Sequence, residues 1–426
     1  MKNIVFIACT LLLFGCNSEE NSKITDIEDY DQYLNAEVSL SEKAAIEELA
    51  FWEARFQNDS TKIIELGKLA GVHSALFAAT GDVLELHKSE KLLKKAIQVS
   101  AREKDGYMRA LAHNYISQHR FKEAKTVLDS AYKFPDNKRE TAFMLFDVAM
   151  ELGDYYTADA LLGEIKNNSD YNYLIRLSKW SDYKGNLDAA IRYMEQAKAI
   201  AESGGVLSLR IWTYTNIADY YGHAGRITES YEHYLKALAL QPDNAYAKKG
   251  IAWIAYSLEK NTSEANRILD SIMVHHKSPD YFLLKAEMAA FDSNPSEAKK
   301  QKDNFVNAVT SGNYGNMYNT YLITLYAESN PIKALQLAVM EVKNRATPET
   351  YQLLAFAQLQ AGKNKEALRT IKKFVADKTF EPEALYHSAL VYKANGLDNK
   401  VAEIKEELKT TSYELGPVVF KEIQQL

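Results

Sequence analysis

The chain has very little cysteine, and this shortage limits its chemistry. Among 426 residues there are two cysteines, Cys9 and Cys16. Cys9 lies within the apolar N-terminal stretch, and Cys16 directly follows that stretch. The remainder of the chain therefore has no thiol for disulfides, thiolate catalysis or cysteine metal sites. Such a body suits an oxidising compartment, where a leftover thiol is a liability.

Neither sign of charge dominates, and the familiar catalytic motifs are missing. The net charge is −6, from 51 basic and 57 acidic residues. Nucleic-acid binding usually needs a basic face, so nucleic acid is not an expected partner. The sequence has no GxGxxG, GxxxxGK[ST], HExxH, GxSxG or EF-hand pattern. His275-His276 is interpreted as a solvated helix end, because adjacent helical side chains point about 100° apart and chelate one metal poorly. We expect a non-enzymatic protein with no cofactor and no metal site.

The N-terminus carries a secretion signal. Lys2 precedes a short apolar run that is too short to span a bilayer. Leu13-Phe14-Gly15-Cys16 then resembles the lipobox of bacterial lipoprotein signal peptides. The resemblance implies removal of residues 1–15, cleavage after Gly15, and diacylglycerol on the sulfur of Cys16. The alternative is an ordinary signal peptide with a chance cysteine.

The residues after Cys16 suggest a location. In the sorting rule of some diderm bacteria, Asp directly after the lipidated cysteine retains the protein in the inner membrane. Asn17 stands there instead, so the outer membrane is favoured, with its periplasmic and cell-surface faces both open. Residues 16–40 are polar and acidic without a lasting helical period, and they predict a flexible tether that lets the body stand off the membrane.

A small residue recurs down most of the chain at intervals of 32 to 40 residues. A fixed period of about 20–50 residues indicates a repeat array. With Ser89 as a divergent first anchor, about ten units are expected over residues 83–409. N-terminal helices are expected over 41–82 and a capping helix over 410–426. Whether the loop at 200–210 divides two sub-arrays is left open. The anchors are Ala124, Ala158, Ala190, Ser230, Ala265, Ala298, Ala334, Ala367 and Val401.

Residues 211–244 form the clearest unit. They predict two helices, separated at Gly225 and ended before Pro242. The fixed packing slots hold Tyr214, Ile217, Ala218, Tyr221, Gly225, Ser230, Tyr234, Ala237 and Pro242. This pattern resembles the tetratricopeptide repeat, with Ser in place of Ala and Ala in place of Gly. The resemblance implies an all-α, right-handed α-solenoid of helix-turn-helix units. It also implies a concave groove, lined by first helices, that holds a protein or peptide.

The candidates for lining the groove are polar or aromatic residues of the first helices that do not occupy the apolar packing positions. The alternative for each is an exposed residue without a binding role. These candidates are Arg109, His113, Asp147, Lys179, Trp212, Asp219, Asn316 and Asn319. The 27 tyrosines are mostly assigned to packing slots. The expected function is a lipid-anchored, non-catalytic scaffold or assembly factor that binds a protein or peptide at the outer membrane. The alternatives are a glycan-capture lipoprotein that partners an outer-membrane transporter, and a barrel-assembly lipoprotein.

Overall fold

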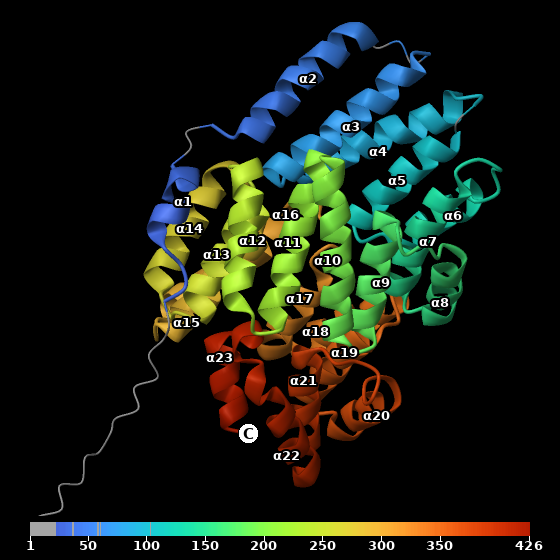
Figure 1. The fold of residues 1–426 in the computed structure, drawn as a ribbon. Coiled ribbons are helices and arrows are strands. Elements are labelled where there is room, and N and C mark those ends of the chain that lie inside the picture. Colours follow the sequence, from blue (N-terminus) through green and yellow to red (C-terminus); the bar gives the residue numbers. More distant parts are fainter. Residues whose placement is uncertain (1–22, 36–37, 58, 60, 103) are drawn as a thin grey trace, which may run out of the picture.

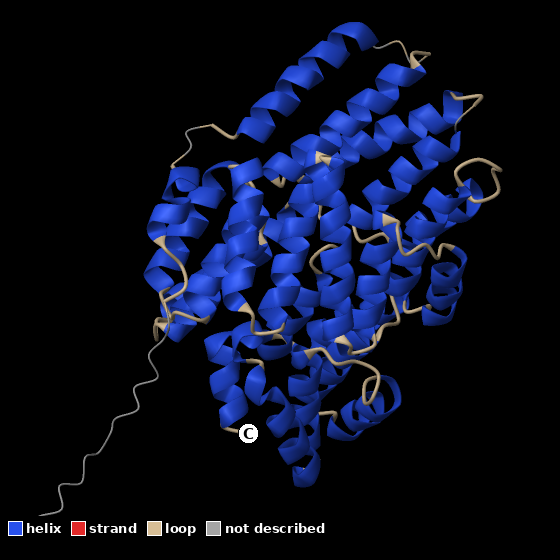
Figure 2. Ribbon diagram, in the orientation of Figure 1, coloured by secondary structure: helices blue, strands red, loops and turns tan. Residues whose placement is uncertain are grey.

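The computed structural model describes residues 23–426, except 36–37, 58, 60 and 103. The expected signal peptide, Gly15 and Cys16 lie outside the described residues. Within the described part the chain is helical, and no strand occurs there (Figure 2). This confirms the predicted fold class, an all-α solenoid of helix-turn-helix repeats.

The array consists of ten consecutive helix pairs (Figure 1). The two helices of each pair pack against each other, and every second helix from α4 to α20 except α16 also packs against the first helix of the next pair. The pairs are α3 (Ile63–Thr80) with α4 (Val83–Val99), α5 (Lys104–Ser117) with α6 (Phe121–Ala131), α7 (Lys138–Leu152) with α8 (Tyr155–Glu164), α9 (Tyr171–Tyr183) with α10 (Leu187–Gly204), α11 (Leu207–His223) with α12 (Ile227–Leu240), α13 (Ala245–Ser257) with α14 (Thr262–His275), α15 (Asp280–Phe291) with α16 (Pro295–Ser311), α17 (Asn319–Ser329) with α18 (Pro331–Asn344), α19 (Pro348–Gln360) with α20 (Asn364–Phe374), and α21 (Pro382–Lys393) with α22 (Asp398–Glu407).

The recurring small residues all lie in the second helix of a pair, and all are buried. Ser89 anchors α4 in the same way, with 0% of its surface exposed. Small side chains let two helices cross closely, which explains why a small residue recurs at this position of each pair. The first pair begins at Ile63, so the expected start of the array at residue 83 is wrong by one helix. The 200–210 segment does not interrupt the array, because α10 runs to Gly204 and packs against α11.

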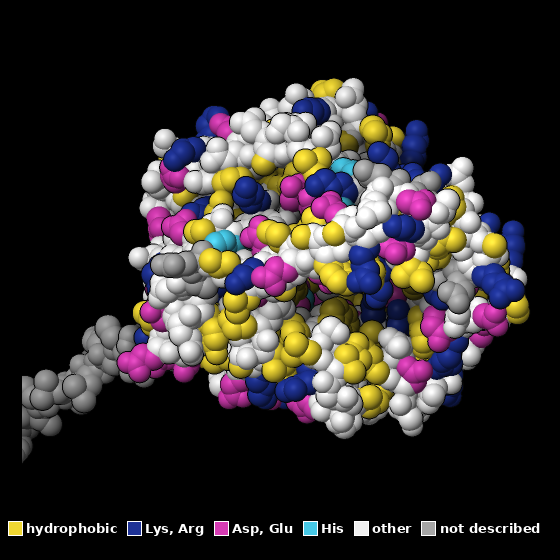
Figure 3. Space-filling view, turned by 90° about the horizontal axis from the view of Figure 1, so that it is seen from above, with side chains coloured by type: hydrophobic (Ala, Val, Ile, Leu, Met, Phe, Trp, Pro, Cys, Tyr) yellow, Lys and Arg dark blue, Asp and Glu magenta, His cyan; other side chains and the backbone are white. Residues whose placement is uncertain are grey.

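The superhelix returns onto itself instead of extending as an open rod. The Lys277 backbone N–H donates to the Thr80 carbonyl oxygen over 2.8 Å, which joins the loop after α14 to the end of α3. Arg345, before α19, lies 3.0 Å from Glu151 of α7, at a sequence separation of 194 residues. The second turn therefore stacks on the ends of first helices in the first turn. Viewed from above, the molecule is hollowed between its rows of helices (Figure 3).

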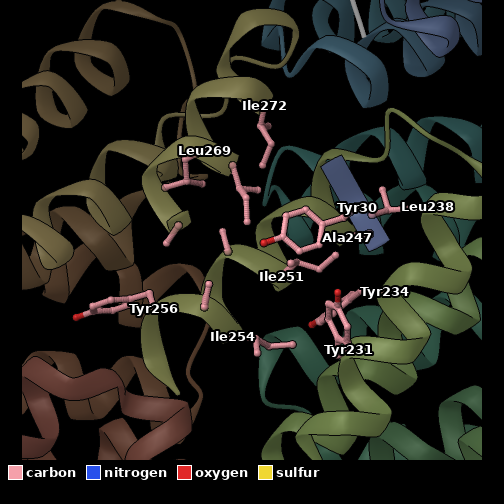
Figure 4. Close-up of a cluster of buried hydrophobic side chains, with 14 of the residues drawn as sticks. Tyr30, Tyr231, Tyr234, Leu238, Ala247, Ile251, Ile254, Tyr256, Leu269 and Ile272 are labelled. Atoms are coloured by element: carbon pink, nitrogen blue, oxygen red, sulfur yellow. The ribbon is translucent and has the colours of Figure 1, made fainter. Parts of the chain in front are cut away.

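The predicted tether over residues 16–40 is wrong for its described part. Residues 27–34 form α1 (Ile27–Leu34), capped by the Asp26 side chain. Tyr30 and Leu34 are buried among residues of α12, α13 and α14, as Figure 4 shows for Tyr30. The apolar face of this short helix was missed because the acidic residues around it hide the helical period. α2 (Leu40–Phe56) follows, and its N-cap is Ser39.

The C-terminal helix α23 (Ser412–Gln424) lies where a capping helix was expected, and it is kinked at Gly416, whose φ is +75°. It packs against α11, α13 and α15 as well as α21. It therefore lies inside the superhelix, across first helices of the preceding turn. Among the described residues, α3 is long and apolar enough to cross a membrane by length and composition. Its residues Leu66, Leu69 and Val72 are buried, as in the core helix of a folded body.

Candidate functional site

A cavity of about 460 Å³ lies between the two turns of the superhelix, and we call it the inter-turn cavity. One wall comes from α7, the start of α8, α9 and the end of α11. The other comes from the segments before α19 and α21 and from the start of α23. Tyr155 and Tyr183 stack in the first wall, with ring centroids 4.1 Å apart. Phe380 lies against Gly185 at the opposite wall.

A chain of ion pairs holds the two walls together. Glu151 accepts from Lys179 over 2.9 Å and from Arg345 over 3.0 Å. Arg345 also donates to Glu341 over 2.9 Å. The charges of Lys179 and Arg345 overcome the burial penalty and hold the pKa of Glu151 below its ordinary value. Glu341 interrupts the apolar stripe of α18, and this buried pairing explains why a carboxylate occupies that position.

Two other carboxylates of the inter-turn cavity, Asp182 and Glu381, make no ion pair within the described part of the chain. Asp182 of α9 and Glu381, before α21, make no side-chain hydrogen bond or ion pair with any residue in the described chain. Burial raises the pKa of Glu381 to about 7, and the charges of Glu414, Asp182 and Glu349 add to the rise. Burial raises the pKa of Asp182 as well. The cavity thus carries anionic charge that the fold compensates only in part, through the nearby charge of His223.

A second cavity of about 650 Å³, the aromatic cavity, lies among α11, α13, α15 and α23. Tyr234 and Tyr246 donate to the two oxygens of Asp219 over 2.5 and 2.6 Å. Burial raises the pKa of Asp219 despite both bonds. Trp253 and Tyr321 add aromatic surface to the lining. The combination of aromatic faces and carboxylates suits a ligand with apolar and cationic groups.

His223 and Glu414 line both cavities, so the two spaces adjoin. The His223 Nδ1 atom lies 3.4 Å from a Glu414 oxygen. Burial alone would lower the pKa of His223, but its contact with Glu414 and the charges of Asp182 and Asp219 raise it to about 9. His223 is therefore an imidazolium at neutral pH and neutralises part of the acidic lining.

Three of the eight predicted groove residues line cavities. Lys179 faces the inter-turn cavity, and Asp219 faces the aromatic cavity. Trp212, which is 42% exposed, lines a neighbouring cavity that shares Tyr246 with the aromatic cavity. His113 is exposed on α5.

The structure assigns other roles to the remaining groove candidates. Arg109 pairs with Asp105 over 2.8 Å, and Asp147 pairs with Arg176 over 2.6 Å. Asn319 is buried and donates to Glu341 over 2.9 Å, so the expectation that it is an exposed groove residue is wrong. Asn316 lies in the turn before α17 instead of on a first helix, and its side chain accepts from Asn319.

Sequence reasoning missed most of the cavity lining. Glu151, Asp182 and His223 lie three or four residues beyond candidates on the same helices, so helical spacing could have found them. Arg345, Glu381 and Glu414 come from the second turn, and no local pattern marks them. His276 is not a solvated helix end. Its Nδ1 atom forms a hydrogen bond with the Tyr281 hydroxyl over 2.8 Å, and its ring lies beside Gly81. No group of His, Cys, Asp and Glu suited to a metal ion occurs among the residues described.

The architecture is that of a helical-repeat protein with an enclosed, charged interior. Residues 213–244, the α11/α12 unit, match the tetratricopeptide repeat family. No curated protein sequence matches the chain. The chain thus contains a tetratricopeptide repeat, within an array of pairs that share its anchor position.

Solved structures with a similar arrangement are distant. The human IFIT1 dimer with PPP-AAAA is 14% identical, with a TM-score of 0.46 over 91% of this chain and 95% of that one. The human IFIT1 dimer with m7Gppp-AAAA is 13% identical, with a TM-score of 0.47 over 73% and 70%. Yeast Tom70 is 13% identical, with a TM-score of 0.38 over 90% and 96%. These values are too low to bear on what this chain binds.

Proposed function

We propose that this chain is a lipid-anchored, non-catalytic scaffold that holds a protein or peptide segment in the inter-turn and aromatic cavities. The observation that carries the proposal is the pair of adjoining cavities. They form one continuous lining across His223 and Glu414, with aromatic faces and carboxylates that lack partners. Helical-repeat proteins commonly use such concave interiors to bind extended partners.

The charges favour a segment that carries lysine, arginine or a free amino group. Asp182 and Glu381 face the inter-turn cavity without an ion-pair partner among the described residues. A bound cation would supply the missing partner and reverse the cost of holding these carboxylates ionised. Stacked tyrosines and Phe380 would contact the aliphatic stems of the same side chains.

The membrane anchor is the part of the proposal that rests on sequence. Cys16 would carry the lipid after cleavage behind Gly15, at the outer membrane of a diderm bacterium, with either face open. Two or three acyl chains on one cysteine would give stable attachment, because a single chain binds only marginally.

The experiment compares capture of envelope proteins by the full lipidated chain and by two charge-reversed forms. The Asp182→Lys/Glu381→Lys form should lose its captured protein at least tenfold. The Asp159→Lys/Glu232→Lys form has the same net charge change on exposed positions of second helices and should keep it. Equal capture by both forms would place binding elsewhere. Saturable binding of glycans by the wild type, with no captured protein, would support the glycan-capture alternative instead.

A further inference from the structure

The N-terminal segment is clamped onto the outside of the solenoid before the array begins. The backbone N–H groups of Ile24 and Thr25 both donate to Glu259, over 2.8 and 2.6 Å. The Thr25 hydroxyl donates to the other oxygen of the same carboxylate over 2.9 Å. Glu259 lies in the loop between α13 and α14, so this loop fixes the point at which the described chain starts.

Side chains of α1 extend the clamp along α12 and α14. The Tyr30 hydroxyl donates to Glu264 over 2.8 Å, and Asp31 pairs with Arg267 over 2.6 Å. The Tyr231 hydroxyl donates to Asp29 over 3.0 Å. Tyr30 is 1% exposed. A buried aromatic ring with a satisfied hydroxyl is a strong attachment.

Two apolar side chains of α1 are buried in the hydrophobic core of the array. Tyr30 and Leu34 belong to the same buried cluster as Ile251, Leu269 and Ile272 (Figure 4). A second attachment follows, where Ser39 and Ser41 donate to Asp243 over 2.8 and 2.9 Å. The segment is therefore held at both ends and in the middle.

The attachment of α1 limits the distance between the helical array and a lipid on Cys16. From Cys16 to Ile24 there are about eight residues, which reach at most about 28 Å when fully extended. If α1 were free, the first held residue would be Ser39, and roughly 23 residues would reach about 80 Å. Docking thus shortens the available reach by about 50 Å.

We propose that residues 24–34 are a strap that holds one end of the solenoid, at the α13–α14 loop, against the phospholipid surface. This rests on the lipid anchor in the proposed function. The α15–α16 loop lies beside the same end, because Thr262 donates to Asp292 over 3.1 Å. The α8 side of the body faces away, since α8 and α15 lie on opposite sides of the molecule (Figure 1).

The test uses the absence of other thiols in the mature chain. A single cysteine replaces Ser263, next to the α13–α14 loop, or Asp159 on α8, and carries a fluorescent donor. The full lipidated protein is placed on phosphatidylethanolamine–phosphatidylglycerol vesicles that contain an acceptor lipid. We expect energy transfer from position 263 to be at least threefold greater than from position 159. Equal transfer from both positions overturns the strap.

Strap variants then test the cause of the orientation. Tyr30→Ala/Leu34→Ala should reduce transfer from position 263 to the level seen from position 159, and Gln32→Ala, on the exposed face of α1, should leave it unchanged. Glu259→Ala provides a second, milder release if the double variant does not fold. Unchanged transfer in the released variants overturns the strap.

Flotation with the vesicles separates this proposal from the anchor on which it rests. Wild-type protein should float, and Cys16→Ala should not. If wild type does not float, the anchor is wrong and the strap falls with it. If wild type floats but transfer from the two positions is equal, the anchor stands and the strap alone is wrong.

Discussion

At the level of single residues, buried carboxylates in the interior lower the stability of the folded state when they are ionised. Glu287 of α15 lines the aromatic cavity and accepts from the Tyr256 hydroxyl over 3.0 Å. Burial raises its pKa from 4.5 to about 7. A group with a raised pKa in the folded state stabilises that state only while it is protonated. The penalty for Glu287 is therefore absent below about pH 4.5 and grows as the pH rises to 7.

Glu287→Gln should raise the stability of the protein at alkaline pH. The amide keeps the shape and removes the buried charge, so the free energy of unfolding should rise by about 2 kcal/mol at pH 8. The gain should shrink toward zero near pH 4.5. Thermal melts at both pH values measure this, with the exposed Glu232→Gln as control. A gain that is the same at both pH values would contradict the assigned titration.

Ligand binding should depend on pH through Glu381. Its pKa of about 7 means that it loses its charge as the pH falls through neutrality. A cationic segment captured at pH 8 should therefore bind roughly tenfold more weakly at pH 6. Titration of the captured partner at both values checks this, and Glu381→Gln should flatten the dependence. Binding that strengthens toward pH 6 would rule out a cationic ligand at this carboxylate.

At the level of helices, the succession of helix pairs could be predicted from the sequence because its cause is local. Two helices cross closely only at small residues, so every anchor from Ala124 to Val401 marks a second helix. The packing of α1 against the array could not be predicted from the sequence, because Tyr30 and Leu34 contact residues more than 200 positions later. Glu341 was also not explained by the apolar pattern, although its partners are close in sequence: Asn319 and Arg345, 22 and 4 residues away, make its buried carboxylate acceptable.

The ends of first helices carry glycines that differ in one informative respect. Gly153 and Gly362 both have a φ of +75°, which alanine adopts at a cost of about 1 kcal/mol. A Cβ on Gly153 would lie 2.6 Å from the Ala346 carbonyl oxygen of the next turn, whereas a Cβ on Gly362 would meet nothing within 4 Å. The two positions form a matched pair for measuring contact between turns.

Gly153→Ala should destabilise the protein more than Gly362→Ala. Both changes cost the backbone about 1 kcal/mol, but Gly153→Ala must also push the turns apart, at a further 1–3 kcal/mol or so. Urea denaturation of the two variants measures the difference. Equal losses would show that the turns are not in contact at this point in solution.

At the scale of the whole molecule, closure of the superhelix creates the site. Periodicity predicts the repeats, but the pitch of the superhelix depends on a small rotation at each junction between successive pairs. Which residues face each other across the turns therefore could not be predicted. Lys179 and Asp219 were found because first helices line the interior, while Arg345, Glu381 and Glu414 depend on the pitch.

If the interior cavities hold a polypeptide, site-specific photo-cross-linking in living cells will capture it there. A benzophenone amino acid replaces Glu349, which lines the inter-turn cavity, or Tyr156, which is 89% exposed on α8. We expect a discrete protein adduct from position 349 and none from position 156. No adduct from position 349, or the same adducts from both positions, would contradict the proposed binding of a polypeptide.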